Sequence, residues 1–171
     1  YARYTKAIDE VEYAMRLAPL SNLSKAKEMF KDLLIDFPSF LEASLMLAKI
    51  YKSEVDIEKE FETYKNAYKY DSENYLLKYE LANLYLHKVG DKQKGMELFH
   101  ECVEKFPTIA NNWSSLGIAC LMNKELETAN MCFNTAIAID PENLYAKLGI
   151  GVVHFERGEF LEAKKHYKAC I

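Results

Sequence analysis

The sequence predicts an all-α protein, a stack of helix–turn–helix pairs that repeats about every 34 residues. Three segments of the sequence support this prediction. Each is amphipathic and ends at a proline, namely Pro38, Pro107 or Pro141. Pro107 and Pro141 are 34 residues apart, and Pro38 and Pro107 are 69 apart, which is two periods plus one residue. Apolar residues within each segment recur at spacings of three and four, the period of one buried helix face.

Five repeats tile nearly the whole of residues 1–171, which we interpret as a single array. We place them at residues 7–40, 41–74, 75–109, 110–143 and 144–171, the last being truncated. The helices are expected at 4–18, 22–37, 40–53, 56–70, 74–88, 91–106, 109–122, 124–139, 143–156 and 159–171. The third repeat holds one extra residue, which we place in the turn around Lys88–Gly90.

Turns and helix starts follow from a few residue types. Gly90 and Gly158 are expected to form turns between paired helices, because glycine adopts left-handed backbone conformations easily. Asp140 is expected to cap the helix that follows it, with Pro141 in the first helical position. Ser39, with Glu42 three residues later, has the pattern of a capping box.

The repeat at 110–143 is the most regular one. It carries Trp113, Leu116, Gly117, Ala129, Phe133, Ala136 and Pro141. This series resembles the tetratricopeptide repeat, whose pattern is W-x2-L-G-x2-Y, then A-x3-F, then P, over about 34 residues. Cys120 stands where that pattern has tyrosine. The resemblance implies a right-handed α-solenoid, an α-α superhelix whose concave face is lined by the first helix of each pair.

The family uses that concave face to bind peptides and helices of other proteins. Applied to this protein, the family geometry places a larger set of residues on this face, Ser114 among them, and nine of the set are the predicted partner-binding residues. They are Leu45, Lys49, Tyr79, Asn83, Asn111, Ile118, Tyr145, Val152 and Phe155. The set becomes more apolar toward the C-terminal half, which suits an amphipathic helix or an extended segment. For each residue the alternative is an ordinary structural place, packed against a neighbouring helix or solvated on a polar face.

The residues at these concave-face positions argue against one class of partner, the C-terminal tails of heat-shock chaperones. Co-chaperones of this family clamp the C-terminal carboxylate of heat-shock chaperones with lysine, arginine and asparagine. From the third repeat onward the corresponding positions hold Tyr79, Asn83, Ser115, Tyr145 and Gly149, which do not make a basic clamp. We therefore do not expect the chaperone tail as a partner.

Other functions find little support in the composition. Acidic residues outnumber basic ones, 26 to 22, so a nucleic-acid surface is not expected. No apolar run is long enough to span a membrane. Cys102, Cys120, Cys132 and Cys170 form no CxxC pair, and His166 and Cys170 alone do not make a zinc site. We expect no catalytic site, no metal and no cofactor within this sequence. Whether the parent protein carries a catalytic domain elsewhere stays open.

The main alternative to a peptide-binding scaffold is a structural role. The sequence begins with Tyr1 and ends with Ile171 inside a helical pattern, which we interpret as a piece of a longer protein. It would then be a segment of a longer solenoid in a stable multi-subunit complex, or it would self-associate through an end that no polar helix covers. The cysteines are sparse and sit among apolar helical neighbours, which favours a reducing, intracellular environment, cytoplasmic or nuclear.

Overall fold

The computed structural model describes residue 13 and residues 23–170. The helix expected at 4–18 lies outside these residues, apart from residue 13. The others form α2 (Leu23–Asp36), α3 (Leu41–Ser53), α4 (Ile57–Tyr70), α5 (Tyr75–Leu84), the π-helical turn η2 (Tyr85–Val89), α6 (Lys92–Lys105), α7 (Ala110–Met122), α8 (Leu126–Ile139), α9 (Leu144–Glu156) and α10 (Phe160–Lys168). The described residues contain no strand, as expected for an all-α protein. The protein divides into an N-terminal unit, Tyr1–Leu77, and a C-terminal unit, Lys78–Ile171.

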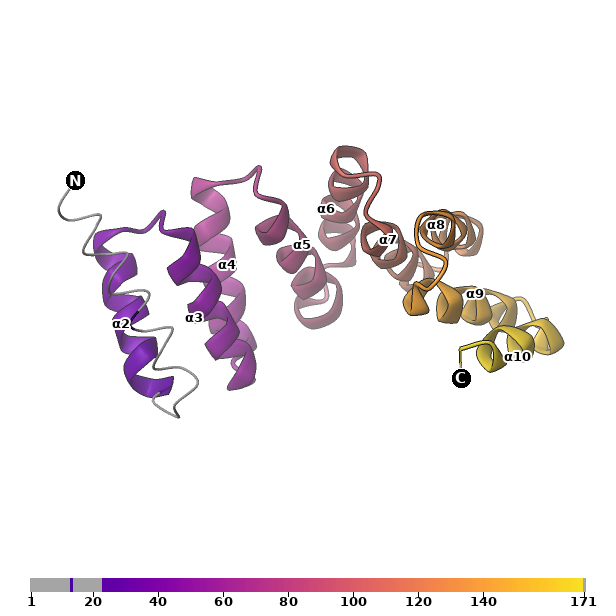
Figure 1. Cartoon of the computed structure of the whole chain (residues 1–171), viewed down its shortest axis with the longest axis horizontal. Helices are drawn as coiled ribbons and strands as arrows, with labels where there is room; N and C mark the ends of the chain where they lie inside the picture. The colour runs from indigo at the N-terminus through magenta and orange to yellow at the C-terminus, as the bar shows by residue number, and fades with distance from the viewer. Residues whose placement is uncertain (1–12, 14–22, 171) are drawn as a thin grey trace. The chain divides into compact units, whose positions relative to one another are not determined.

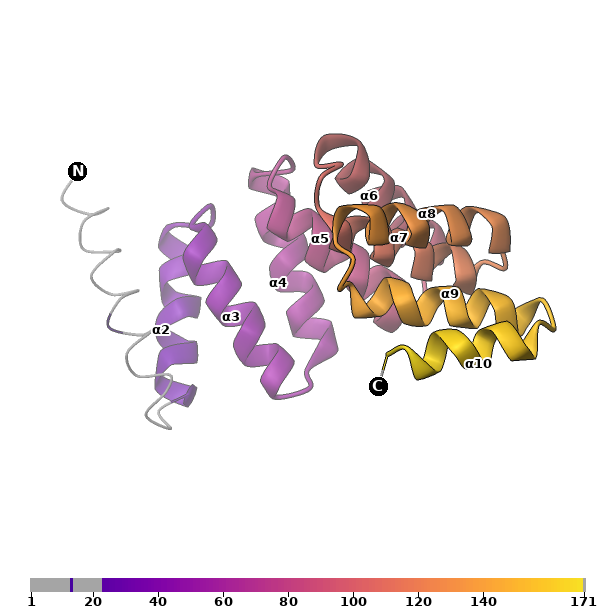
Figure 2. The same cartoon turned by 45° about the vertical axis from the view of Figure 1, so that its right-hand side comes forward.

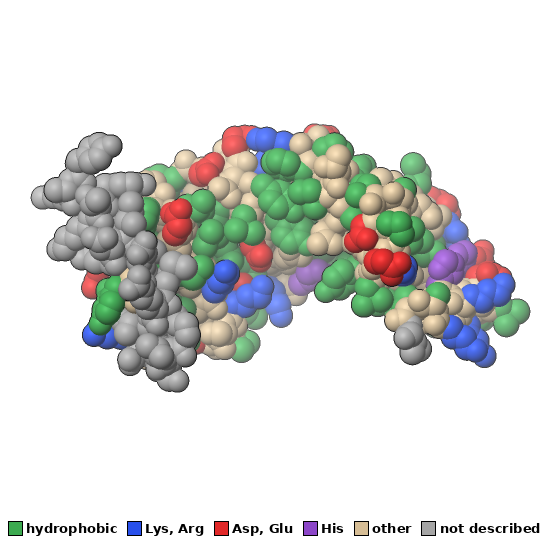
Figure 3. Space-filling model, in the orientation of Figure 1, with side chains coloured by type: hydrophobic (Ala, Val, Ile, Leu, Met, Phe, Trp, Pro, Cys, Tyr) green, Lys and Arg blue, Asp and Glu red, His purple; other side chains and the backbone are tan. Residues whose placement is uncertain are grey.

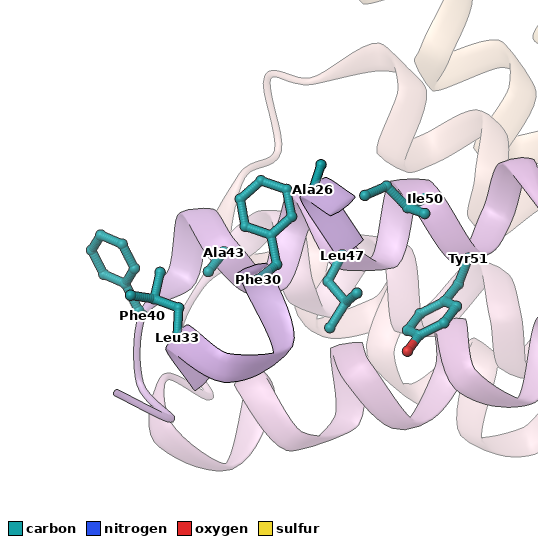
Figure 4. Close-up of a cluster of buried hydrophobic side chains, with 8 residues drawn as sticks. All are labelled: Ala26, Phe30, Leu33, Phe40, Ala43, Leu47, Ile50 and Tyr51. Atoms are coloured by element: carbon teal, nitrogen blue, oxygen red, sulfur yellow. The ribbon is translucent and has the colours of Figure 1, made fainter. Parts of the chain in front are cut away.

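The helices of the N-terminal unit pack in chain order, α2 against α3 and α3 against α4 (Figure 1). A cluster of buried side chains holds α2 and α3 together (Figure 4). It consists of Ala26, Phe30, Leu33, Phe40, Ala43, Leu47, Ile50 and Tyr51. Ala26 and Ala43 are small and fully buried, which lets the two helices approach while Phe30 fills the space beside them.

The C-terminal unit pairs α7 with α8 and α9 with α10, and α8 also packs against α9 (Figure 2). Phe133 of α8 is completely buried, with Gly117 of α7 and Gly149 of α9 both directly against its ring. A Cβ atom on Gly117 would lie 2.6 Å from Cε1 of Phe133, which is inside van der Waals contact. In the next pair Gly151 of α9 lies in the same way against the ring of Tyr167. Glycines of the first helices therefore make room for an aromatic ring from a second helix.

The extra residue of the third repeat is absorbed by the π-helical turn η2. The backbone N–H of Gly90 donates to the carbonyl of Tyr85, five residues earlier, at 3.0 Å. A turn closed over five residues holds one residue more than an α-helical turn. The sequence predicts the insertion at Lys88–Gly90, and the structure places it slightly earlier, at the end of the first helix.

Two of the predicted helix caps are wrong. Asp140 ends α8, and its carboxylate accepts from the backbone N–H of Glu142 at 3.0 Å within the turn. The cap of α9 is Asn143, whose side chain accepts from the N–H of Ala146 at 3.0 Å. Likewise α3 begins after Phe40 without a capping side chain. In both places the turn takes more residues than expected, so the helix starts later in the sequence.

In the described part of the protein, the turn inside each helix pair has one residue in the left-handed region. That residue is Val55, Gly90, Lys124 or Gly158 in the four successive pairs, with φ angles of 59°, 84°, 65° and 80°. Gly90 and Gly158 confirm the turn prediction. A β-branched side chain is poorly suited to this conformation, because its Cβ atom crowds the backbone.

Replacing Val55 with glycine is expected to raise the free energy of unfolding by about 1 kcal/mol, because it removes this backbone strain. Val55 is solvent-exposed, so few contacts are lost. Urea unfolding followed by circular dichroism measures the change. Gly158→Val is the matched reverse substitution, since no atom lies within 4 Å of a Cβ atom there. A loss of stability in Val55→Gly would contradict the strain argument.

Candidate functional site

The first helices of the C-terminal unit enclose a shallow hollow of about 220 Å³. It is lined by Tyr79, Asn83, His87, Asn111, Ser114, Ser115, Ile118 and Tyr145. These residues come from α5 and η2, from α7 and from α9, the first halves of three successive pairs. Five of the nine predicted partner-binding residues are therefore brought together: Tyr79, Asn83, Asn111, Ile118 and Tyr145.

Hydrogen bonds hold the polar side chains of this hollow in place. The Tyr79 hydroxyl lies 3.0 Å from the Ser115 hydroxyl, which connects α5 to α7. The Asn83 side-chain amide donates to the Tyr79 carbonyl at 3.0 Å. The ring of Tyr79 also meets Phe99 of α6 edge-on, at a centroid distance of 5.7 Å. Tyr79 is thus fixed from two sides.

The opposite wall is held by a pair of asparagines. The side-chain amide of Asn143 donates to Oδ1 of Asn111 at 3.0 Å, and the same Asn143 caps α9. One residue therefore sets both the start of α9 and the position of Asn111. The N–H groups of the Asn111 side chain belong to an exposed residue, where a ligand can accept from them.

The hollow is polar but carries no formal charge. The residues that line it include no lysine, arginine, aspartate or glutamate. Partial burial of the ring, with a smaller contribution from the Lys88 cation, lowers the pKa of His87 below its usual value, which favours the neutral ring. Neutral donors and acceptors next to Ile118 and two tyrosine rings suit peptide groups and an apolar side chain rather than a charged terminus.

The other predicted residues lie elsewhere. Val152 and Phe155 continue along the exposed side of α9 beyond Tyr145, and the Phe155 ring meets Phe160 edge-on at 5.3 Å. Leu45 and Lys49 are on α3 in the N-terminal unit, Leu45 half-buried and Lys49 exposed. These four do not line the hollow.

Sequence reasoning missed His87 and Ser115 as lining residues. Each follows a predicted residue by four positions, His87 after Asn83 and Ser115 after Asn111, and so lies on the same helix face. That spacing was the available signal. The bond between Tyr79 and Ser115 joins residues 36 apart, so it depends on how the pairs stack.

The cysteines and histidines form no further site among the residues that the structure describes. No three of the His, Cys, Asp and Glu side chains between residues 23 and 170 come close enough to hold a metal ion. Cys102, Cys120 and Cys132 are buried free thiols, and Cys170 is half-buried. Burial raises the pKa of the Cys102 thiol to about 11, which keeps it protonated and unreactive at neutral pH. No helix in the described part of the protein is long and apolar enough to cross a membrane.

Comparison with known proteins points to one repeat family. No protein-family model matches the sequence. A curated TPR repeat-containing protein of Methanocaldococcus jannaschii is 32% identical over 87 residues, which are 51% of this chain and 15% of that protein. The match therefore spans only a small part of its relative.

Solved structures resemble this protein over almost its whole length. The structure of MamA from Desulfovibrio magneticus RS-1 has a TM-score of 0.84 at 16% identity, covering 96% of this chain and 93% of that one. YrrB, described as a TPR protein with an unusual peptide-binding site, has a TM-score of 0.79 at 18% identity, covering 96% of this chain and 84% of that one. The resemblance read from Trp113, Gly117, Ala129 and Phe133 is therefore confirmed: this protein has the all-α solenoid fold of the tetratricopeptide-repeat proteins.

Proposed function

We propose that the protein is an interaction scaffold that holds a segment of another protein on the first helices of its C-terminal unit. The observation that carries this proposal is the uncharged hollow between Tyr79, Asn111 and Tyr145. Its amides and hydroxyls can bond to the peptide groups of a segment, while Ile118 and the tyrosine rings contact an apolar side chain. The structurally similar YrrB is described as having a peptide-binding site, which agrees with this type of ligand.

Tyrosines are well suited to anchor such a segment. Aromatic side chains lose little conformational entropy on binding and often dominate the affinity of an interface. Tyr145 is 64% exposed, so its ring is available to a ligand and its removal leaves the core intact. Val152 and Phe155 extend the apolar surface from Tyr145 along α9 and can contact a longer helix or segment.

The double substitution Tyr79→Ala and Tyr145→Ala is expected to weaken binding of a protein partner at least about tenfold, since aromatic anchors commonly contribute more than about 1 kcal/mol each. Affinity capture with the intact protein supplies the partner, and biolayer interferometry then gives Kd for the parent and the variant. Met131→Ala is the matched control, because Met131 is 70% exposed but lies on α8, a second helix. Unchanged affinity in a folded double variant would refute the proposed site.

A structural role is the second candidate, and the exposed end of the C-terminal unit favours it. Phe133 of α8 is fully buried because α9 covers it, whereas Tyr167, 34 residues later on α10, is only half-buried. Leu161 of α10 is also exposed at this end. A further helix with a small residue against the Tyr167 ring would cover the face as Gly149 covers Phe133.

This further helix would belong to an adjoining repeat of a longer array or to a second copy of the protein. Sedimentation velocity over a concentration series tests the second source. Self-association that Leu161→Lys abolishes supports it, whereas a monomer up to millimolar concentration contradicts it. Binding through the first-helix hollow is independent of this face, so the two candidates can be separated.

A further inference from the structure

A second hollow, of about 440 Å³, lies in the N-terminal unit between the second helices α2 and α4. Its floor is formed by α3 through Ser44 and Leu47. Leu45 and Lys49, the predicted first-helix residues of this unit, do not line it. The volume lies within the range of pockets that bind ligands, and it is about twice that of the hollow described above.

The hollow has a buried apolar floor and exposed apolar walls. Leu47 and Ala67 are almost completely buried at the bottom. Ile35 of α2 and Tyr70 of α4 line the sides and are 79% and 58% exposed. Both units expose hydrophobic side chains among charged ones (Figure 3). Here, however, two large exposed apolar residues border one hollow, so a ligand between them would cover both and reach the floor.

The charged residues that line the hollow are both lysines. Lys31 stands on α2 and is paired with Glu28 at 2.8 Å. The Lys69 ammonium of α4 donates to Oδ1 of Asn66 at 2.7 Å and meets no carboxylate among the residues that the structure describes. No aspartate or glutamate lines the hollow. Its electrostatic complement is therefore a carboxylate next to an apolar group.

We propose that this hollow binds the C-terminal end of a protein segment, whose last residue presents a large apolar side chain beside its terminal carboxylate. The apolar side chain lies between Ile35 and Tyr70 over Leu47, and the carboxylate pairs with Lys69. The scaffold then has two recognition surfaces of different chemistry, an uncharged one on first helices and a basic, apolar one on second helices. This second surface does not depend on the function proposed for the first.

Two small probes that differ only in charge test the proposal. N-acetyl-L-phenylalanine carries an aromatic ring and a carboxylate, and N-acetyl-L-phenylalaninamide carries the same ring without the charge. Each is titrated into the intact ¹⁵N-labelled protein, and amide chemical shifts report the site and Kd. We expect shifts in α2, α3 and α4, and binding of the carboxylate at least about threefold tighter than the amide.

Substitutions identify the groups responsible. Lys69→Gln is expected to abolish the preference for the carboxylate, and Tyr70→Ala to weaken both probes at least about threefold. Both residues are exposed, so the variants keep the fold. Lys65→Gln is the matched control, because Lys65 is also on α4 but does not line the hollow. The substitutions Tyr79→Ala and Tyr145→Ala leave these shifts unchanged if the two surfaces are separate.

Three results would overturn the proposal: equal affinity for the two probes, a carboxylate preference that survives in Lys69→Gln, or shifts that lie outside α2, α3 and α4. Dodecanoate serves as a further arm. If dodecanoate shifts the same amides and N-acetyl-L-phenylalanine does not, the hollow binds lipid-like acids and the protein-segment assignment is wrong.

Discussion

Replacing Phe133 with alanine is expected to lower the free energy of unfolding of the C-terminal unit by about 3–5 kcal/mol. The side chain is completely buried, and its neighbours on both sides are glycines, Gly117 and Gly149. Glycines have no side chain that could move into the space, so the cavity stays open. Trp113, the single tryptophan, lies on α7 in this unit. Its fluorescence during urea unfolding therefore measures the change locally.

Phe160→Ala is the control for this substitution, because it removes the same side chain from a position that is 61% exposed. Its expected cost is below about 1 kcal/mol, since little apolar area is buried there. Similar losses for the two variants would mean that the ring of Phe133 does not hold α7, α8 and α9 together.

Replacing Gly149 with alanine is expected to destabilise the same unit by about 1–3 kcal/mol, as overpacking of a core does. Helix propensity alone predicts the opposite effect, because alanine inside a helix is normally more stable than glycine by about 1 kcal/mol. The added Cβ atom would collide with Cζ of the buried Phe133 ring, which has no room to move. Urea unfolding by Trp113 fluorescence again measures the difference.

A double-mutant cycle separates the collision from the propensity. In a Phe133→Leu background the smaller side chain leaves space, so Gly149→Ala is expected to cost less than in the parent. The pair Asn134→Gly and Asn134→Ala, at an exposed position of α8, gives the intrinsic preference alone. An additive cycle would show that contact with Phe133 is not the reason for the glycine.

The repeat period, the helix order and the positions of the small residues Gly117 and Ala129 in the repeat could be read from the sequence, because all depend on spacing between residues. The partners of the small residues could not. Gly117 and Ala129 are both small and suit a close helix crossing, whereas the structure places Gly117 against the ring of Phe133, four residues further along α8. The choice depends on the rotation of one helix against the other, which the spacing does not fix.

Hydrogen bonds between residues on different helices could not be predicted from the sequence either. Asn112 is fully buried, and its side-chain amide donates to the carbonyls of Cys102 and Phe106 at 3.2 and 3.1 Å, which ties α7 to the end of α6. Nothing in the local pattern distinguishes it from its exposed neighbour Asn111. The caps failed for a related reason, since both Asp140 and Asn143 are capping residue types and only the length of the turn decides between them.

The candidate site was predictable in part. The family geometry selected Tyr79, Asn83, Asn111, Ile118 and Tyr145, which do line one hollow. It also selected Leu45 and Lys49 on α3, whereas the hollow of the N-terminal unit lies between α2 and α4 and neither residue lines it. The family pattern describes which residues of the first helices bind a partner. It therefore could not predict a binding surface formed by second helices.

The central claim is that a protein partner lies on the first helices of the C-terminal unit. Site-specific photocrosslinking tests this claim most directly. A photoreactive benzoylphenylalanine is placed at Tyr145 on α9 or at Met131 on α8, which are 64% and 70% exposed. The captured partner protein is irradiated in the complex, and the covalent adducts are quantified by mass spectrometry. The account predicts strong crosslinking from position 145, its loss when Tyr79→Ala is added, and background crosslinking from position 131. Crosslinking that is equal at both positions, or stronger from α8, would contradict it.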